Sequence, residues 1–336
     1  MKIESDYSLK NYNTFGIEAK AKKFVEVTNV EELSEVLQNY PEPKFLLGGG
    51  SNMLLTQDID ALVIYLNLKG KEIIKEDDDY AWVRAQAGEN WHEFVLFCID
   101  NNLGGIENMS LIPGNVGTTP VQNIGAYGTE IKDTFDSCEA LHIESQELRQ
   151  FNNVDCKFGY RESVFKNDEK GKYIITSVVF KLTKKNHKIN TAYGDITAEL
   201  DSRNIKNPSI NDVSDAVIAI RQSKLPNPKE LGNSGSFFKN PIITKTEFDK
   251  IYAQNPTMPH YVVSEEFVKV PAGWLIEQAG FKGKRFGDAG IHKNQALVLV
   301  NYGNATGQEI LAVARDIQST VLAKYGIAIE AEVNII

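Results

Sequence analysis

The sequence lacks the common fingerprints of phosphate-binding and hydrolytic sites. No G-x-G-x-x-G and no Gly-Lys-Ser/Thr occurs in its 336 residues, which excludes the dinucleotide-binding fingerprint and the Walker loop. No G-x-S-x-G occurs either, so the sharp turn that exposes the serine of an α/β-hydrolase is missing. A phosphate-bearing ligand would therefore need another kind of site.

Cysteine, histidine and long apolar runs are also scarce. The three cysteines, Cys98, Cys138 and Cys156, form no C-x-x-C pair, and the five histidines show no ligand spacing, so neither a disulfide framework nor a metal site is indicated. We expect buried, reduced thiols. The N-terminus has no apolar core of a signal peptide, and no run approaches the roughly 20 apolar residues that span a bilayer. These features predict a cytoplasmic protein without a membrane partner.

Positive charge is in deficit, with 36 Lys and Arg against 45 Asp and Glu and a net charge of -9. Nucleic acids and anionic membranes bind clustered Lys and Arg, so neither is an expected partner. A small anionic ligand remains possible, because Lys157, Arg161 and Lys166 form one local basic group and Arg221 and Lys224 another. The alternative is that these are ordinary solvated charges.

Two uncharged segments are rich in glycine. Residues 111–128 hold four glycines, two prolines and no charged side chain. Glycine lets backbone N–H groups approach a ligand closely, and Thr118 and Thr119 add hydroxyl donors, so this segment could hold a diphosphate without lysines. A second cluster, residues 48–52, follows the apolar strand expected at 45–47. A long structural loop is the alternative for the first segment, but two such loops favour a nucleotide cofactor.

The predicted elements mix α and β without the regular alternation of a doubly wound sheet. A capping box of Thr28 and Glu31 predicts a helix that ends at Tyr40, and a second helix is expected at 91–99, closed by Gly104. Strands are expected at 61–67 and 327–333, and a hairpin at 72–74 and 82–87. Thr306 and Glu309 cap a last helix that Gly326 ends. Prolines at 226 and 228 mark a domain boundary.

Three residues stand out as candidates for chemistry. Arg161, beside Tyr160, could bind a carboxylate through paired N–H bonds, although a single arginine is more often structural. Ser236 follows a flexible turn and could donate a proton if a neighbour assists, but it could equally form an ordinary serine turn. Glu330 and Glu332 share one face of the last strand, for which we favour solvent exposure over burial.

An ordered set of motifs resembles the MurB family of UDP-N-acetylenolpyruvoylglucosamine reductases, type I branch, over nearly the full chain. The family belongs with vanillyl-alcohol-oxidase-type FAD-binding proteins. The matching motifs are Asn13-Thr14-Phe15-Gly16, Gly48-Gly49-Gly50-Ser51-Asn52, Ile112-Pro113-Gly114 through Gln122-Asn123-Ile124-Gly125-Ala126-Tyr127-Gly128, Phe158-Gly159-Tyr160-Arg161, Gly235-Ser236-Phe237-Phe238-Lys239-Asn240-Pro241 and Ala272-Gly273-Trp274-Leu275-Ile276.

The resemblance implies an α+β fold with a two-part FAD-binding module and a smaller α+β substrate-binding domain. It places FAD-binding subdomain 1 at 1–68, completed by strand 327–336, subdomain 2 at 69–225, and the substrate-binding domain at 226–326. It implies FAD and NADPH as cofactors, UDP-N-acetylglucosamine enolpyruvate as substrate, and a monomer. NADPH reduces FAD, which passes hydride to the enolpyruvyl double bond.

The resemblance also implies residue roles. Arg161 and Glu332 stabilise the enolate and Ser236 protonates it. The expected cofactor contacts are Gly48, Gly49, Gly50, Ser51, Asn52, Pro113, Gly114, Thr118, Thr119, Asn123, Gly125 and Tyr127. The expected substrate contacts are Tyr160, Tyr193, Arg221, Lys224, Asn240, Tyr261 and Gln295, with Tyr193-Gly194-Asp195 resembling a mobile tyrosine loop. The chain departs from the family at Asn334, where a basic residue is usual, and at Thr118-Thr119, where serines are usual.

Three other functions compete with the reductase. A substrate-oxidising FAD flavoprotein of the same superfamily would share the glycine loops but not the Ser236 and Glu332 motifs. A non-enzymatic sugar-nucleotide sensor would keep the loops and lose a catalytic residue, and none is lost here. A serine hydrolase ranks last, because it has neither an elbow nor a placed histidine.

Overall fold

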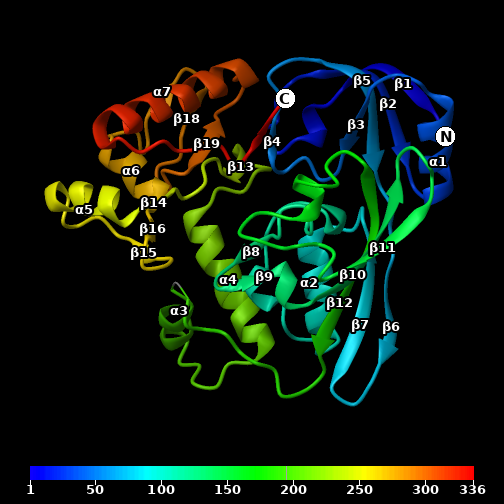
Figure 1. Ribbon diagram of the computed structural model, residues 1–336, viewed down its shortest axis with the longest axis horizontal. Coiled ribbons are helices and arrows are strands. Elements are labelled where there is room, and N and C mark those ends of the chain that lie inside the picture. The colour runs from blue at the N-terminus through cyan, green and yellow to red at the C-terminus, as the bar shows by residue number, and fades with distance from the viewer. Residues whose placement is uncertain (194) are drawn as a thin grey trace. The chain divides into compact units, whose positions relative to one another are not determined.

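The computed structural model describes residues 1–193 and 195–336, so Gly194 of the expected tyrosine loop lies outside the described residues. The chain forms two compact units, and each gathers separate stretches of sequence (Figure 1). Unit 1 comprises Met1–Tyr7, Lys22–Gly49 and Asp60–Arg221, and unit 2 comprises Ser8–Ala21, Gly50–Ile59 and Gln222–Ile336.

Unit 1 contains two larger sheets. The four-stranded sheet has the order β1-β2-β5-β3, and its strands are β1 (Ile3–Ser8), β2 (Lys20–Val27), β5 (Ile59–Leu66) and β3 (Lys44–Leu47). The five-stranded antiparallel sheet has the order β11-β10-β12-β7-β6, and its strands are β11 (Leu148–Asn152), β10 (Phe135–His142), β12 (Tyr173–Thr183), β7 (Tyr80–Gln86) and β6 (Lys71–Glu76). The predicted hairpin is therefore confirmed as β6 and β7.

The helices of unit 1 are α1 (Val30–Asn39), α2 (Trp91–Asp100), α3 (Ile196–Ser202) and α4 (Ile210–Lys224), whose last three residues belong to unit 2. They bury apolar faces, α1 and α2 against the sheets and α3 and α4 mainly against each other. Trp91, Phe94 and Phe180 meet in the main core, with the Phe94 and Phe180 ring centroids 5.1 Å apart, so α2 lies on the sheet that contains β7 and β12 (Figure 1). This packing fixes the start of α2, where the glycine-rich segment 111–128 is attached.

Unit 2 contains three small sheets. They have the orders β13-β19-β18-β17, β14-β16-β15 and β20-β4, with β13 (Gly232–Ser236), β19 (Val298–Asn301), β18 (Ala289–Ile291), β17 (Arg285–Phe286), β14 (Ile242–Thr244), β16 (Phe267–Lys269), β15 (Tyr261–Val262), β20 (Asn334–Ile335) and β4 (Met53–Leu54). Its helices are α5 (Lys245–Gln254), α6 (Ala272–Gln278) and α7 (Gly307–Tyr325).

Short elements complete the fold. A two-residue hairpin joins β8 (Gly125–Ala126) to β9 (Thr129–Glu130). Tyr127 and Gly128 both have positive φ, 48° and 78°, as a type I′ turn requires. Five 3₁₀ turns lie at η1 (Lys10–Tyr12), η2 (Glu107–Met109), η3 (Val116–Thr118), η4 (Ile131–Asp133) and η5 (Val164–Lys166).

Several predicted element ends differ from the structure. Helix α1 is capped by Asn29, not Thr28, because the Asn29 side chain accepts from the Glu32 N–H, and Glu32 in turn accepts from Thr28. Helix α2 ends at Asp100, before Gly104. The capping box of α7 and its stop at Gly326, with φ of 68°, are confirmed.

The last segment is not the continuous strand predicted at 327–333. Only Asn334–Ile335 is regular strand, paired in parallel with β4, while the preceding residues pair at isolated points such as Phe238 with Ala331. The side chain of Gln318 on α7 donates to the Ile329 carbonyl oxygen, which replaces a ladder bond at that point. The long-range partners thus decide how this segment pairs.

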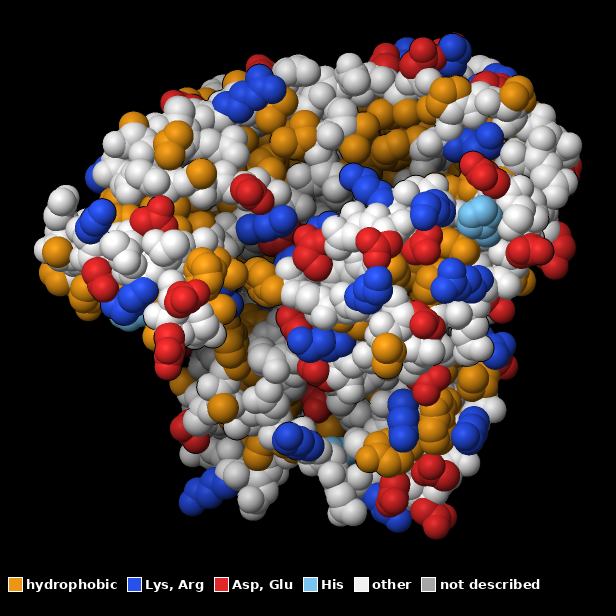
Figure 2. All heavy atoms as spheres, in the orientation of Figure 1, with side chains coloured by type: hydrophobic (Ala, Val, Ile, Leu, Met, Phe, Trp, Pro, Cys, Tyr) orange, Lys and Arg blue, Asp and Glu red, His pale blue; other side chains and the backbone are white. Residues whose placement is uncertain are grey.

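The three cysteines are buried and unpaired, as predicted. Over the described residues, no helix is both long enough and apolar enough to cross a bilayer. Basic and acidic side chains are interspersed over the face shown in Figure 2.

Candidate active site

The sequence holds two glycine loops: in chain order, the first loop is residues 48–52 and the second loop is residues 111–128. They touch each other within unit 1 through Gly48 and Gly49. A Cβ atom added at Gly49 would lie 2.9 Å from the Asn115 Oδ1 atom and 2.9 Å from the Gly114 Cα atom. One added at Gly48 would lie 3.0 Å from the Thr118 methyl carbon. Gly49 is therefore required for the close approach of the two backbones.

The second loop is held by the segment that leads into α2. The Trp91 N–H donates to the Gly114 carbonyl oxygen at 3.0 Å, the Val116 N–H donates to the Glu89 carbonyl oxygen at 2.9 Å, and the Gly117 N–H donates to the Ala87 carbonyl oxygen at 3.0 Å. These bonds anchor one side of the loop to buried backbone. The loop conformation is thus set by the core of unit 1.

The expected role of the threonine hydroxyls as free donors is wrong in this structure. The Thr118 hydroxyl donates to the Asn115 carbonyl oxygen at 2.8 Å, and the Thr119 hydroxyl donates to the Val116 carbonyl oxygen at 2.7 Å. Each hydroxyl has only one proton to give, so both are spent inside the η3 turn. The threonines shape the loop, and the backbone N–H groups of residues 116–119 are likewise bonded within the protein.

Asn123 ties this loop to the segment that carries Arg161. Its buried side chain donates to the Gly159 carbonyl oxygen at 2.9 Å and accepts from the Lys132 N–H at 3.1 Å. Arg161 has a positive φ of 58° and donates to the carbonyl oxygens of Gly125, at 2.9 Å, and Asn123, at 3.3 Å. The guanidinium also lies 5.5 Å from the Tyr160 ring centroid. Arg161 is thus oriented from the second glycine loop.

Arg221, near the end of α4, is a poorly compensated charge. Its Nε atom is shielded from solvent and has no hydrogen-bond partner among the described residues. Burial lowers the pKa of Arg221, and the nearby Tyr127 phenol opposes that shift. A guanidinium whose shielded Nε atom lacks a partner among the described residues favours an anionic ligand.

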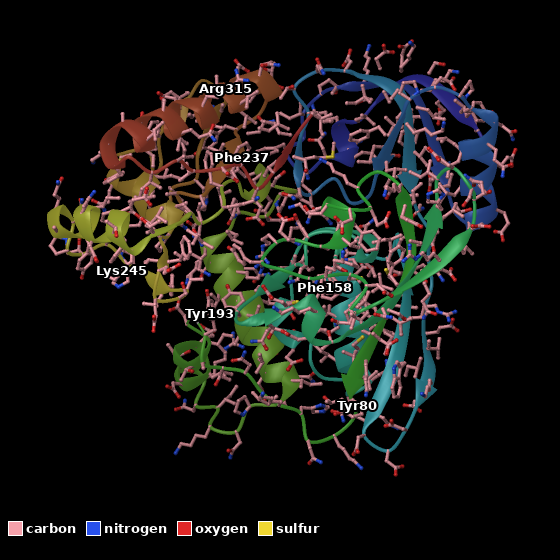
Figure 3. The ribbon with its side chains drawn as sticks, viewed as in Figure 1. Tyr80, Phe158, Tyr193, Phe237, Lys245 and Arg315 are labelled. Atoms are coloured by element: carbon pink, nitrogen blue, oxygen red, sulfur yellow. The ribbon has the colours of Figure 1, made fainter. Side chains whose placement is uncertain are left out.

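Tyr193, expected to contact the substrate, precedes α3 and is half exposed (Figure 3). Its ring meets the Tyr127 ring edge-on, with centroids 6.5 Å apart. The tyrosine therefore lies beside the β8–β9 hairpin of the second glycine loop.

Unit 2 brings Ser236 and Glu332 onto adjacent backbone segments. Ser236 ends β13 and is exposed, and the next residue, Phe237, accepts through its carbonyl oxygen from the Glu332 N–H at 2.8 Å. The pairing continues through the Phe238–Ala331 bridge. The buried Phe237 ring, which is labelled in Figure 3, meets the Phe15 ring edge-on, with ring centroids 6.4 Å apart, and this contact fixes the strand end. The Glu330 side chain is 79% exposed, as favoured, whereas Glu332 is partly buried.

Asn52 connects the first glycine loop to Glu332. Its side chain donates to the Glu332 carbonyl oxygen at 3.4 Å, and its own carbonyl oxygen accepts from the N–H and side-chain amide of Asn334, at 3.1 and 2.8 Å. Gly50 has a φ of 59°, and a Cβ there would lie 1.9 Å from the Tyr12 carbonyl oxygen. Asn334, which departs from the family pattern, therefore has a defined partner.

The remaining predicted substrate residues of unit 2 are spread over several segments, and Asn240 and Gln295 lie outside the helices and strands. The Asn240 Oδ1 atom accepts from the Ala272 N–H at 2.9 Å, and the Gln295 Oε1 atom accepts from the Leu297 N–H at 3.3 Å. Tyr261 on β15 is 51% exposed, and Lys224 at the end of α4 is exposed. Sequence reasoning missed His92 and Asn115, because no spacing pattern marks either residue and only the folded loops bring them into play.

The fold and the glycine loops define a flavoprotein. Residues 21–145 match the FAD binding domain family, and residues 227–336 match the C-terminal domain of UDP-N-acetylenolpyruvoylglucosamine reductase. The chain belongs to the UDP-N-acetylenolpyruvoylglucosamine reductase family and has its α+β FAD-binding fold.

Full-length relatives carry this assignment. The chain is 72% identical to the UDP-N-acetylenolpyruvoylglucosamine reductase of Flavobacterium johnsoniae, over 100% of both chains. It is 47% identical to that of Pseudomonas syringae pv. tomato, over 99% of this chain and 98% of the relative. Among solved structures it is similar to the reductase of Thermus caldophilus, with a TM-score of 0.69 at 25% identity over 100% of this chain and 99% of the other.

Proposed function

We propose that this protein catalyses the NADPH-dependent, FAD-mediated reduction of UDP-N-acetylglucosamine enolpyruvate to UDP-N-acetylmuramate in peptidoglycan synthesis. The observation that carries the proposal is the contact between two uncharged glycine loops, Gly49 against Gly114, in a member of this family. When bound, FAD reduced by NADPH supplies the hydride.

The glycine loops fit a flavin dinucleotide. At Gly49 and Gly117 an added Cβ would meet neighbouring atoms at 2.9 and 2.4 Å, so the chain keeps these positions free of side chains and the backbone itself forms the loop surface. Neutral donors suit a diphosphate in a protein of net charge -9, because no buried lysine is needed. We assign the cofactor to Gly48–Asn52 and to Pro113, Gly114, Thr118, Thr119, Asn123, Gly125 and Tyr127, with Thr118, Thr119 and Asn123 shaping the loop.

We assign the chemical roles to Arg161, Glu332 and Ser236. Addition of hydride to the enolpyruvyl double bond leaves negative charge on the carboxylate and its α-carbon. Arg161 keeps its proton and can stabilise that charge, while its bonds to Gly125 and Asn123 hold the guanidinium in place. Ser236 donates a proton to the carbanion. Glu332 helps to stabilise the enolate, and the bond from its N–H to the Phe237 carbonyl oxygen holds its backbone beside that of Ser236 in unit 2.

Substrate binding is assigned to Tyr160, Tyr193, Arg221, Lys224, Asn240, Tyr261 and Gln295. Arg221 is the strongest member of this set, because its buried guanidinium has an Nε atom without a partner among the described residues and suits a phosphate or carboxylate. The side-chain oxygens of Asn240 and Gln295 accept hydrogen bonds from backbone N–H groups of the protein. The side-chain NH₂ groups of the same two residues can then donate to ligand oxygens.

An anaerobic visible spectrum tests the proposed function. NADPH and then UDP-N-acetylglucosamine enolpyruvate are added in turn to the purified protein. A yellow protein that bleaches with NADPH and regains its colour with the enolpyruvyl substrate is expected. A protein that binds no FAD would refute the flavoprotein assignment, and bleaching without recovery would instead favour the substrate-oxidising relative.

Replacing Arg161 with lysine is expected to lower kcat for product formation about a hundredfold, because the positive charge remains but the two-armed contact with the substrate anion is lost. The rate of bleaching by NADPH should change little. Stopped-flow spectroscopy of each half-reaction measures both rates. Arg203→Lys is the control, since Arg203 pairs with Glu199 within unit 1 at an exposed position. Equal loss in both half-reactions would assign Arg161 to cofactor binding.

Replacing Tyr193 with alanine is expected to raise KM for the enolpyruvyl substrate several-fold to tenfold and to leave FAD affinity unchanged. The physical reason is that half of Tyr193 is exposed and its ring meets the Tyr127 ring edge-on, so the ring is available to a ligand at little cost to the fold. Tyr80→Ala, also on an exposed tyrosine, serves as the control. An unchanged KM would remove Tyr193 from the substrate site.

We propose that the functional parts are 1–68 with 327–336, 69–225, and 226–326. Pairing of β20 with β4 supports joining the chain end to the first part. The two compact units divide the chain differently, because Ser8–Ala21 and Gly50–Ile59 of the first part belong to unit 2. We also place the activity in the cytoplasm, which the three unpaired thiols support. Cell fractionation with an antibody against the protein tests this location.

A further inference from the structure

His92 makes a single directed contact with the second glycine loop. It is the second residue of α2, and its Nδ1 atom accepts from the Leu111 N–H at 3.0 Å. Because Nδ1 accepts here, the ring proton of the neutral imidazole must be on Nε2. In a protonated imidazole the Nδ1–H group would face the Leu111 N–H, and the hydrogen bond would be lost.

The partner of that bond is a backbone position that leucine rarely adopts. Leu111 has a φ of 60°, in the left-handed region, where its side chain crowds the main chain. Leu111 lies three residues before Gly114, the glycine that contacts Gly49. The His92 contact therefore acts at a strained entry to the loop.

Two other bonds from α2 hold the same stretch. The Trp91 N–H donates to the Gly114 carbonyl oxygen, and the Trp91 indole N–H donates to the Met109 carbonyl oxygen at 2.9 Å. Neither group changes its charge near neutral pH. His92 provides the one contact of these three that protonation can switch off.

Burial and the neighbouring charge of Arg221 favour the neutral form of His92. Burial lowers the pKa of His92 below its ordinary value of 6.5, the Arg221 guanidinium on α4 lowers it further, and Glu93, next to it on α2, opposes the shift. The neutral, accepting form therefore dominates above pH 6.5, and the contact with Leu111 weakens only when the pH falls below that value.

We propose that His92 is a positioning residue for FAD: its neutral Nδ1 atom fixes Leu111 and so the Pro113–Thr119 loop, and protonation of His92 weakens FAD binding. The inference rests on the proposed function, because it takes these loops as the FAD site. His92 itself need not touch the cofactor. It acts through the backbone of Leu111.

The test measures the Kd of FAD for the flavin-free protein, by quenching of flavin fluorescence, from about pH 5 to about pH 8. Wild-type affinity is expected to fall as the pH drops below 6.5. His92→Phe keeps a ring but cannot accept, and is expected to bind FAD about tenfold more weakly at neutral pH. His92→Asn places an amide oxygen near the Nδ1 position and cannot titrate. It is expected to restore neutral-pH affinity and to lose the acid-side fall.

The outcomes separate this inference from the proposed function. Wild-type protein that takes up no FAD at any pH would refute the proposed function itself. Wild-type binding with a His92→Phe variant of equal affinity, or an acid-side fall that persists unchanged in His92→Asn, would overturn the role of His92. If His92→Phe does not fold, the comparison of wild type with His92→Asn still decides the question.

Discussion

Replacing Ser236 with alanine is expected to slow product formation about a hundredfold to ten-thousandfold, the range for removing a positioned proton donor. Bleaching of the flavin by NADPH should proceed at the wild-type rate, because that half-reaction needs no proton at the substrate carbanion. Ser236 is exposed at the end of β13, so the loss of its hydroxyl removes no buried contact. Anaerobic stopped-flow spectroscopy of the two half-reactions gives both rates.

The control for this variant is Ser319→Ala on α7, an exposed serine whose hydroxyl donates to the Asp316 carbonyl oxygen. It should leave both half-reactions unchanged. If Ser236→Ala reoxidises with the enolpyruvyl substrate as fast as wild type, Ser236 is not the proton donor. We would then expect a water molecule near Glu332 to be the proton donor.

Replacing Gly49 with alanine is expected to weaken FAD binding by up to about a hundredfold, since overpacking a tight contact costs about 1–3 kcal/mol. The new Cβ would lie 2.9 Å from atoms of both Asn115 and Gly114, and the backbone of Gly114 is itself held by Trp91. The loops would separate, and the cofactor surface would be lost. FAD titration of the flavin-free protein measures the change.

Gly303→Ala is the matched control, because Gly303 is exposed and the nearest atom to its added Cβ is a side-chain oxygen of Asp288 at 3.3 Å. Its FAD affinity should equal that of wild type. A thermal melt adds an independent check. FAD should raise the Tm of wild type and of Gly303→Ala but not that of Gly49→Ala, and a normal FAD-induced rise in Gly49→Ala would show that the loop contact is dispensable.

Local chemistry made several elements predictable from sequence. The capping box of Thr306 and Glu309 and the left-handed Gly326 bound α7 because both ends depend on residues within one turn of the helix. The hairpin of β6 and β7 followed from apolar runs around an acidic turn. The cap of α1 was misplaced by one residue, because Thr28 and Asn29 are both good caps and only the fold selects Asn29.

The site divides in the same way. The sequence by itself determined the family and the two glycine loops and predicted catalytic roles for Arg161, Ser236 and Glu332, because these features are carried by short motifs in fixed order. It gave no sign that the Thr118 and Thr119 hydroxyls bond within their own loop. Nor did it indicate the bond from His92 to Leu111.

Only the tertiary structure decided which of these pieces meet. Gly49 touches Gly114 across 65 positions of sequence, and the Glu332 N–H bonds to the Phe237 carbonyl oxygen across 95 positions. Such contacts form when the core around α2 and the sheets around β13 and β4 bring distant backbones together, and their free energy is a property of the packed whole. Residue identity decides which chemistry a side chain can perform, and the long-range packing decides which groups that side chain contacts.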